Sequence, residues 1–290
     1  MSDIPFVFFG AGHIAEMALE EMSVHDLTPS LIVTAPDAPA GRGRVLTPSP
    51  VAAWAAARNI ETLKPKRLDL EFLKKLEARS SALAPVFVVI DYGAILPKDL
   101  LTIPSRGVLN MHPSLLPRLR GPSPIRSAIL HNERETGVSV MLVDEELDHG
   151  PILAQKKVQV EDWPPHGPEL DALMAREGGK LLAEILPHWI VGEIEAREQN
   201  HDLATYCEKF EKSDGLLDLS GDAQENLRKI YAFEGWPGTY TFFERNQKRI
   251  RVQILDAHTE GTKLILDRVK PEGRSEMSYT DLKRSGAKIA

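Results

Sequence analysis

Residues 86–117 read VFVVIDYGAILPKDLLTIPSRGVLNMHPSLLP, and two apolar runs within this stretch indicate the fold. The run at 86–90 is continuously apolar, which is typical of a parallel strand that is covered on both faces. The run at 108–111 predicts a neighbouring strand. Outward from this pair, further strands are predicted at residues 6–9, 31–33, 138–143 and 152–160.

Helical patterns fill intervals between these strands. They are predicted at residues 14–22, 51–57, 125–130 and 169–186. Strands that alternate with helices favour right-handed βαβ units. We therefore expect an α/β fold, with a Rossmann-like, doubly wound, mainly parallel sheet that carries helices on both faces.

The character of the chain changes near residue 195. The stretch at 195–221 is polar and weakly periodic, as a linker is. From Gly238 onward the runs TYTFF, RIRVQILDAH and TKLILDRVKP are separated by turn residues, which indicates a small β-rich domain. We predict a large domain at 1–190, a linker at 191–221 and a small C-terminal domain at 222–290.

The composition excludes several classes of protein. The chain has 290 residues and a formal net charge of −7, which suits a globular protein with two domains. Its single cysteine, Cys207, excludes an internal disulfide and a cysteine-based metal site. No apolar run is long enough to cross a bilayer, and no signal-peptide pattern is visible at the N-terminus. We expect a cytoplasmic protein with no metal and no membrane partner.

The excess negative charge belongs to the first 200 residues. Residues 201–290 contain 15 basic and 15 acidic side chains, and residues 244–290 contain 11 Lys or Arg against 7 Asp or Glu. The acidic total, which alone argues against a nucleic-acid partner, therefore conceals a basic C-terminal segment. Such a local excess also arises by chance in small β domains, and both interpretations stay open at this point.

The motif GAGHIA at residues 10–15 lies between a predicted strand and a predicted helix, as a dinucleotide-binding turn does. No Asp or Glu ends the strand at 31–33, where the ribose of a dinucleotide would be held. We interpret the motif as a tight strand–helix turn and expect no NAD.

Three polar side chains form a candidate site. Asn110 and His112 alternate with Met111, so they point to the same side of a strand that Pro113 ends. Asp148 follows the next predicted strand. Open parallel sheets bind ligands at the carboxyl ends of their strands, and an amide, an imidazole and a carboxylate there suit acyl transfer. Each of the three residues alone is also typical of a turn or of a structural hydrogen bond.

These residue types fit the attack of an amine on an acyl carbon. Asn110 Nδ2 and a protonated His112 can donate to the developing oxyanion. Asp148 can orient His112 and help to take up the proton that the amine loses. The substrate supplies the nucleophile, which agrees with the lack of a convincing Ser, Cys or Lys nucleophile motif in the sequence.

The runs NMHPSLLPRLRG at 110–121 and MLVDEELDHGPIL at 141–153 resemble the signatures of the 10-formyltetrahydrofolate-dependent formyltransferases. The resemblance implies a formyltransferase fold, 10-formyltetrahydrofolate as co-substrate, and Asn110, His112 and Asp148 as catalytic residues. It also implies that the YGAILP and SLLP segments bind the folate. The folate-binding residues so predicted are Tyr92, Gly93, Ile95, Leu96, Pro97, Ser114, Leu115, Leu116, Pro117 and Leu142.

The stretch PDAPAGRGRVLTPSPV at 36–51 is similar to a loop that marks the branch of this family acting on initiator methionyl-tRNA. The resemblance implies that Arg42 and Arg44 approach the tRNA. Residues 201–219 and 228–240 resemble the linker of that branch and its entry into a small OB-like β-barrel. We expect a monomer whose partners are 10-formyltetrahydrofolate and initiator methionyl-tRNA. The basic residues expected to face the RNA are Lys248, Arg249, Arg251, Lys263, Arg268 and Lys270.

The sequence departs from the family pattern at several points. Asp91 stands where relatives usually carry a small apolar residue, and His149 stands where Thr is common. Only 53 residues follow Pro237, fewer than in relatives, and the shortfall lies between Ala257 and Val269. We therefore expect a reduced barrel.

Three alternatives stay open. A sugar-nucleotide N-formyltransferase uses the same formyl donor and the same three residues, and a formyltetrahydrofolate hydrolase uses water as the acceptor. A non-catalytic RNA- or nucleotide-binding module would use only the GAGHIA turn and the basic C-terminal segment. The PAGRGR loop and that segment favour an RNA acceptor, and the three polar residues favour an enzyme.

Overall fold

The structure is a computed structural model that describes residues 4–41, 43–80 and 84–289. The chain forms two compact units, and each contains separate stretches of sequence. Unit 1 comprises Met1–Arg120, Thr136–Gln159 and Asp171–Tyr206, and unit 2 comprises Gly121–Glu135, Val160–Leu170 and Cys207–Ala290. The domain limits predicted at residues 190 and 221 stay a prediction.

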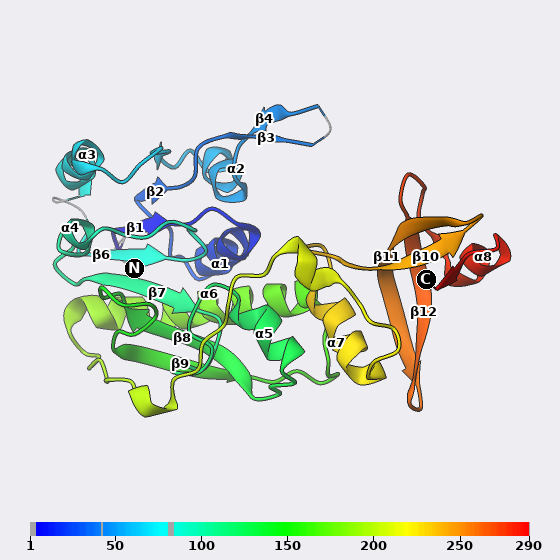
Figure 1. The fold of residues 1–290 in the computed structure, drawn as a ribbon. Helices are drawn as coiled ribbons and strands as arrows, with labels where there is room; N and C mark the ends of the chain where they lie inside the picture. The colour runs from blue at the N-terminus through cyan, green and yellow to red at the C-terminus, as the bar shows by residue number, and fades with distance from the viewer. Residues whose placement is uncertain (1–3, 42, 81–83, 290) are drawn as a thin grey trace. The chain divides into compact units, whose positions relative to one another are not determined.

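Unit 1 is built on a seven-stranded sheet with the order β5-β2-β1-β6-β7-β8-β9 (Figure 1). The five strands from β5 to β7 are parallel, and β8 and β9 are each antiparallel to the strand before them. The strands are β1 (Phe6–Phe9), β2 (Leu31–Val33), β5 (Thr62–Leu63), β6 (Val86–Val89), β7 (Val108–His112), β8 (Thr136–Leu142) and β9 (Ile152–Val158).

Helices pack on both faces of this sheet. On one face, α3 (Leu70–Ser80) and α4 (Lys98–Leu101) place Leu76 and Leu100 in a core cluster with Phe9 of β1. α1 (His13–Val24) follows β1 directly and contacts α2 (Pro50–Ala57). The predicted doubly wound, mainly parallel sheet is confirmed.

The long helix α6 (Gly167–Val191) lies against β7 and α1, and its two adjacent glycines make this approach possible. A Cβ atom at Gly178 would lie 2.6 Å from the sulfur of Met111, and one at Gly179 would lie 2.6 Å from the carbonyl oxygen of Ala18. Glycine weakens a helix. Here it allows the backbone of α6 to reach the sheet, so the helix runs unbroken through and beyond the predicted 169–186.

The direction of β8 differs from the expected βαβ pattern. β8 runs antiparallel to β7, with His112 opposite Ser139. The helix between them, α5 (Pro124–Leu130), is not a crossover helix on the sheet, because it belongs to unit 2 and packs there on α7 (Ala223–Ala232). The chain therefore leaves the sheet after β7 and returns to it as the antiparallel neighbour of that same strand.

Two short strands within the stretch at 36–51 pair as a hairpin, where we expected a loop. Its strands β3 (Ala38–Ala40) and β4 (Val45–Thr47) are antiparallel. Val45 and Leu46 are each 68% exposed, so this hairpin contributes little to the core of unit 1.

Unit 2 contains a five-stranded antiparallel sheet with the order β13-β12-β11-β10-β14. α7 packs Leu227 and Ile230 onto Phe243 and Val252 of this sheet. The small, barrel-like β domain predicted from the C-terminal pattern is thus confirmed. Its strands and second helix are β10 (Thr239–Arg245), β11 (Lys248–Glu260), β12 (Lys263–Pro271), β13 (Met277–Ser278), α8 (Tyr279–Arg284) and β14 (Lys288–Ile289).

The predicted linker at 191–221 contains only two short 3-10 turns, η1 (His201–Leu203) and η2 (Lys212–Gly215), as regular structure. Among the residues that the structure describes, no helix combines the length and the apolar character needed to cross a membrane.

Candidate active site

Asn110, His112 and Asp148 meet at the carboxyl end of β7. Asn110 Nδ2 donates to Asp148 Oδ1 over 3.4 Å, and His112 Nδ1 lies 3.7 Å from Asp148 Oδ2. The His112 side chain is 5% exposed and that of Asp148 is 12% exposed. The structure therefore brings the three predicted catalytic side chains together in a site that is largely shielded from water.

Asp148 does not follow a strand that runs parallel to β7, as the parallel-sheet pattern predicted. β8 is antiparallel to β7, so its last residue, Leu142, lies opposite Leu109 rather than beside His112. The segment after β8 then folds back toward the carboxyl end of β7. Gly150 allows the return, because a Cβ atom there would lie 2.1 Å from the carbonyl oxygen of Leu142.

The position of the imidazole is set by a backbone carbonyl. His112 Nε2 lies 2.9 Å from the carbonyl oxygen of Leu119. A carbonyl oxygen only accepts hydrogen bonds, so Nε2 carries a proton and Nδ1 is the nitrogen that faces Asp148. Protonation of His112 at Nδ1 would thus create an ion pair with Asp148.

The predicted folate segment SLLP, residues 114–117, is held by two polar side chains of β8 and β9. Ser139 Oγ donates to the carbonyl oxygen of Ser114 at 2.6 Å and accepts from the amide of Leu116 at 3.1 Å. Gln155 Nε2 donates to Ser139 Oγ and to the carbonyl oxygen of Leu116, at 2.8 Å each. These bonds leave the backbone of the segment little freedom.

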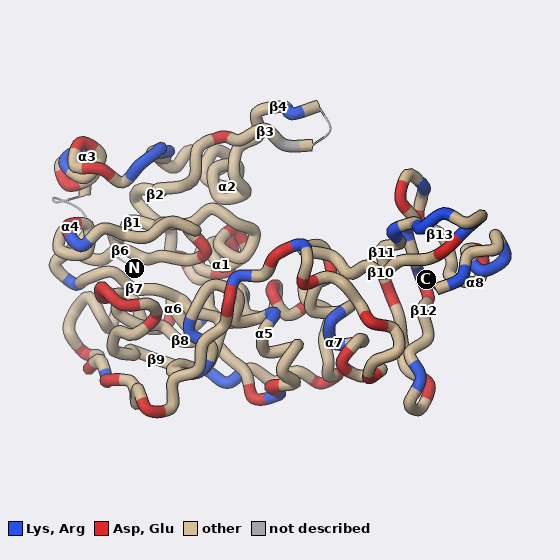
Figure 2. Tube along the Cα trace, viewed as in Figure 1, with Lys and Arg blue, Asp and Glu red and all other residues tan. Residues whose placement is uncertain are grey.

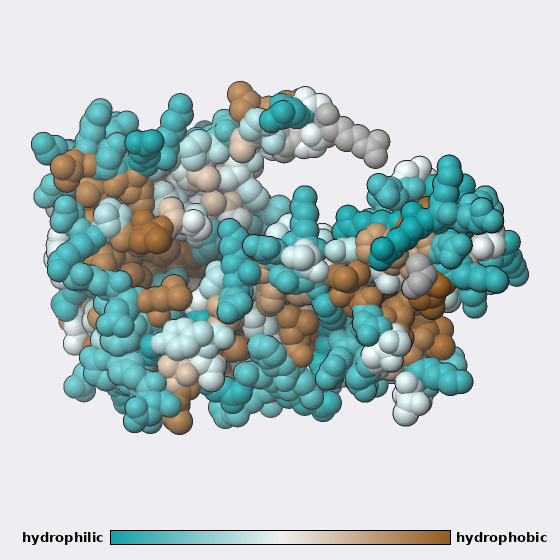
Figure 3. All heavy atoms as spheres, viewed as in Figure 1, coloured by the Kyte–Doolittle hydropathy of each residue, from teal (hydrophilic) through white to brown (hydrophobic). Residues whose placement is uncertain are grey.

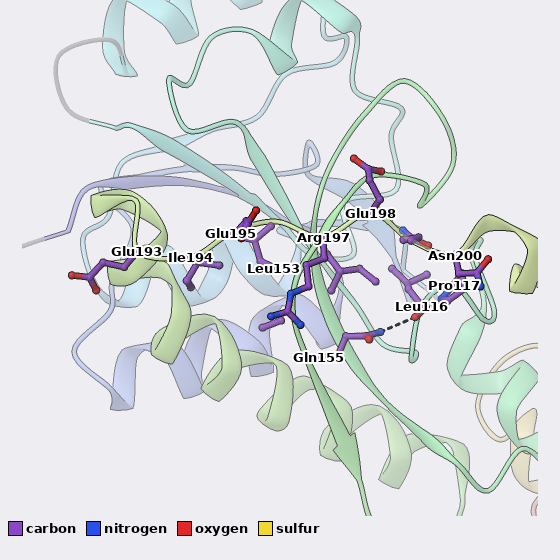
Figure 4. Close-up of a pocket in the computed structure, with 13 residues that line it drawn as sticks. Leu116, Pro117, Leu153, Gln155, Glu193, Ile194, Glu195, Arg197, Glu198 and Asn200 are labelled. Atoms are coloured by element: carbon purple, nitrogen blue, oxygen red, sulfur yellow. Dashed lines mark hydrogen bonds between the residues drawn. The ribbon is translucent and has the colours of Figure 1, made fainter.

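A groove of about 770 Å³ lies between β9 and residues 193–200, and Leu116 and Pro117 form part of its wall (Figure 4). The hydrogen bond from Gln155 to Leu116 joins two residues of this wall. Its lining does not include Asn110, His112 or Asp148. The groove is therefore distinct from the site at the end of β7.

The second predicted folate segment, residues 92–97, is anchored at one end and exposed in its middle. Tyr92 packs edge-on against Phe9 with ring centroids 5.5 Å apart, and burial raises the pKa of Tyr92 to about 12. Ile95 is 95% exposed, an unusual state for an isoleucine. Apolar side chains gather over the region of β6 and α4 (Figure 3). The other predicted folate residues stand as follows: Gly93 has a φ of +77°, and Leu96, Pro97, Leu115, Pro117 and Leu142 are half-buried.

The residues predicted to contact tRNA lie in both units. Arg42 lies outside the described residues, and Arg44 is exposed at the turn of the β3–β4 hairpin. In unit 2, Arg268 is paired with Asp256 and Glu276, and Lys263 begins β12. Lys and Arg residues are frequent along the C-terminal sheet and α8 (Figure 2).

Two arginines of β11 lie over aromatic rings of β10. The Arg249 guanidinium is 3.9 Å from the ring centroid of Phe242, and that of Arg251 is 3.8 Å from the ring centroid of Tyr240. Strand alternation places Lys248 on the opposite face. We call Tyr240, Phe242, Arg249 and Arg251 the aromatic–arginine face.

Asp91, one of the departures from the family pattern, lies against the GAGHIA turn. Its carbonyl oxygen accepts from the amides of Ala11 and Gly12, and a Cβ atom at Gly12 would collide with its carboxylate. Burial, and then the charge of Asp171, raise the pKa of Asp91 from 3.8 to about 6, although His13 acts in the opposite direction.

An Asp91→Asn variant should lose part of the pH dependence of stability. The folded state binds the Asp91 proton more tightly than the unfolded state, so the free energy of unfolding falls as pH rises from about 4 to about 6 and then levels off. Asn does not titrate, so this fall should shrink in the variant. Thermal midpoints at about pH 4.5 and pH 7.5 measure the effect. An identical pH dependence in both proteins would contradict it.

A model of the formyl transferase family matches residues 4–184. The chain belongs to the formyltransferase family. It is 43% identical to a methionyl-tRNA formyltransferase of Chloroflexus aurantiacus over 260 residues, which cover 88% of this chain and 81% of the relative.

Two solved structures share the fold of this formyltransferase. One is a methionyl-tRNA formyltransferase from Clostridium thermocellum, with a TM-score of 0.60 and 15% identity over 92% of this chain and 98% of that chain. The other is an N-formyltransferase from Helicobacter canadensis, in complex with folinic acid and dTDP-3-aminofucose, with a TM-score of 0.61 and 18% identity over 88% of each chain. The described residues of this formyltransferase contain no group of three or more His, Cys, Asp or Glu side chains that could hold a metal ion.

The sequence patterns did not reveal four buried or partly buried polar residues that support the site. Ser139 and Gln155 bond to the SLLP segment. Gln199 bonds to the carbonyl of Asp148, and Arg120 bonds to Gln199. Arg120 lies within a quoted motif, but the other three are ordinary polar residues of a strand or a linker. Only their burial and their partners distinguish them.

Proposed function

We propose that this formyltransferase transfers the formyl group of 10-formyltetrahydrofolate to the amino group of methionine on initiator tRNA, in the cytoplasm. The observation that carries the proposal is the match, over most of both chains, to a relative named for methionyl-tRNA. The meeting of Asn110, His112 and Asp148 at one strand end supports it, because these groups serve amine attack on an acyl carbon.

The proposed reaction needs hydrogen-bond donors for the formyl oxygen, which gains negative charge as the amine attacks. Asn110 Nδ2 has two hydrogens, and one of them suffices for Asp148. The other is available to the oxygen. A protonated His112 adds positive charge beside it, held in place by the carbonyl of Leu119.

The attacking amine must also lose a proton. The Asp148 carboxylate faces His112 and Asn110, and it can accept that proton while His112 stays protonated. The distances of 3.4 and 3.7 Å to Asn110 and His112 are long for hydrogen bonds. Catalytic hydrogen bonds are often long without substrate and tighten in the reacting complex.

The donor would lie between the two predicted folate segments. 10-Formyltetrahydrofolate supplies the formyl carbon. Exposed apolar surface at Ile95 suits a flat ring system, and the backbone of residues 114–117 is preorganised by Ser139 and Gln155. No metal and no NAD enter the proposed reaction.

Basic residues on the surface of each unit would contact the acceptor. Arg42 and Arg44 of the hairpin stretch are proposed to contact the tRNA, as are Lys248, Arg249 and Arg251 of the C-terminal sheet. Guanidinium groups pair with phosphates, and aromatic rings with adjacent arginines suit stacking of unpaired bases. The aromatic–arginine face offers both kinds of contact.

A sugar-nucleotide N-formyltransferase is the second candidate, since the similar fold from Helicobacter canadensis was solved with an amino-sugar nucleotide. At 18% identity that similarity shows the fold alone. The hairpin with Arg44 and the aromatic–arginine face favour a nucleic-acid acceptor instead.

The decisive experiment supplies the purified enzyme with 10-formyltetrahydrofolate and one acceptor at a time. Charged initiator methionyl-tRNA should be formylated at its amino group, and the same tRNA without methionine should not react. Formylation of dTDP-amino sugars with no reaction on methionyl-tRNA would contradict the proposal. Release of formate without either acceptor would indicate the hydrolase.

A further inference from the structure

A buried chain of hydrogen bonds runs from Arg120 through Gln199 to the turn that carries Asp148. Gln199 Nε2 donates to the carbonyl oxygen of Asp148 at 2.9 Å and to that of Gly150 at 2.8 Å. Gln199 Oε1 accepts from Arg120 Nε at 3.2 Å and from Arg120 Nη2 at 2.7 Å. Gln199 is 5% exposed and Arg120 is 2% exposed, so water hardly competes for these bonds.

Arg120 decides which way the amide of Gln199 faces. A guanidinium has only donors, so the amide oxygen must face Arg120 and the amide hydrogens must face the turn. Arg120 Nη2 also meets His201 Nδ1 at 2.8 Å. Among the side chains that the structure describes, its guanidinium thus bonds to an amide and an imidazole rather than to a carboxylate. A buried guanidinium held in this way is costly, which argues for a role beyond packing.

Gln199 bonds to a turn whose backbone conformation is unfavourable. Asp148 has a φ of +48°, in the left-handed region that residues with a β-carbon seldom occupy. Gln199 binds the carbonyls on both sides of His149 and so opposes relaxation of this turn. Relaxation would swing the Asp148 carboxylate away from Asn110 and His112, whose distances to it are already long.

The segment that orients Gln199 also holds His112. Leu119 accepts from His112 Nε2 through its carbonyl, and its amide donates to Thr205 Oγ1 at 2.8 Å. The amide of Arg120 donates to the carbonyl of Thr205 at 2.8 Å. His112 and Asp148 are therefore both positioned from residues 119 and 120, which are tied in turn to residues 199–205.

We propose that Gln199, oriented by Arg120, is a positioning residue that sets Asp148 against His112 and Asn110 for formyl transfer. Gln199 reaches only backbone carbonyls of the Asp148 turn, so its influence on turnover passes through Asp148. The inference rests on the proposed function in one respect, namely that Asp148 acts in the transfer.

The test uses Gln199→Glu, which keeps the size of the side chain. A carboxylate keeps the contact with Arg120 but has no hydrogen for the carbonyls of Asp148 and Gly150. We expect kcat to fall by about 10- to 100-fold, the scale of a small misplacement in an active site, while the KM values of both substrates change by less than about twofold. The ion pair that Arg120 gains offsets part of the cost of the two unpaired carbonyls, so the thermal midpoint is measured as well and kcat is compared at a temperature at which both proteins are folded. Gln159→Glu is the matched control, since it makes the same substitution at an exposed residue just beyond β9 and should leave kcat unchanged.

A double variant separates positioning from a general structural effect. In an Asp148→Asn background, Gln199→Glu should cause no further loss of kcat, because there is no carboxylate left to position. A multiplicative loss in that background would overturn the proposal, and so would wild-type kcat in the single variant. If Gln199→Glu does not fold, Gln199→Asn carries the same expectation, because its amide is too short to reach both Arg120 and the turn.

All variants are assayed with the acceptor that the wild-type enzyme formylates. A wild-type enzyme inactive on methionyl-tRNA but active on an amino-sugar nucleotide would refute the proposed acceptor, and the Gln199 comparison would still be made on that nucleotide. An active wild type together with a fully active Gln199→Glu variant would refute the positioning role alone.

Discussion

An Asn110→Ala variant is expected to lose about 10²- to 10³-fold in kcat, the usual cost of removing one oxyanion donor. Asn110 Nδ2 is the amide donor at the end of β7, and it also contacts the carboxylate of Asp148. Alanine removes both functions. The predicted folate segment at 114–117 keeps its supports, Ser139 and Gln155, and Tyr92 keeps its contact with Phe9, so the KM for 10-formyltetrahydrofolate should change by no more than about threefold.

Single-turnover measurements with saturating donor and methionyl-tRNA would give this loss directly. Gln159→Ala serves as the control, because it also removes an amide from unit 1, at an exposed position just beyond β9. Near-normal turnover in Asn110→Ala would refute its role as an oxyanion donor. A rise in KM without a fall in kcat would place Asn110 in ground-state binding instead.

Replacing Lys248, Arg249 and Arg251 together by alanine is expected to weaken tRNA binding by about 100-fold at 150 mM salt. Each phosphate contact contributes roughly 0.9 to the slope of log affinity against log salt, so the slope should decrease by about 2 to 3. The loss of the two arginines also removes the cations that lie on Phe242 and Tyr240. Turnover at saturating tRNA should be retained, because the formyl transfer takes place in unit 1.

A salt titration of tRNA affinity checks both numbers. Lys74→Ala with Lys75→Ala on α3 is a control that removes charge from exposed positions of unit 1. Lys248→Ala alone should have a smaller effect than either arginine, since it lies on the opposite face of β11. An unchanged KM and an unchanged salt slope in the triple variant would refute the assignment of this surface to tRNA.

Much of unit 1 could be predicted because its signals are local. A buried parallel strand is apolar at successive positions, as at residues 86–89, and a helix starts and stops at capping and breaking residues over a few positions. The shared side of Asn110 and His112 also follows from strand alternation. Local patterns do not report the direction of a strand, so the antiparallel β8 and the hairpin at residues 38–47 were not foreseen.

The supports of the site escaped prediction for a related physical reason. Gln199 is 79 residues from Arg120 and 51 from Asp148, and Gln155 is 39 from Leu116. In sequence, each of these glutamines looks like any polar residue of a linker or strand. Their importance arises from burial, which removes water as a competing partner and makes each unmade hydrogen bond costly.

The sequence by itself determined the α/β class, the β-rich C-terminal region and the identity of Asn110, His112 and Asp148 as candidates, because periodicity and strand ends are short-range properties. Only the tertiary structure decided that the loop after the antiparallel strand β8 folds back and places Asp148 beside Asn110. It also decided that Arg120 and Gln199 hold that loop. These are contacts between distant parts of the chain, and packing alone selects which distant polar groups are buried together.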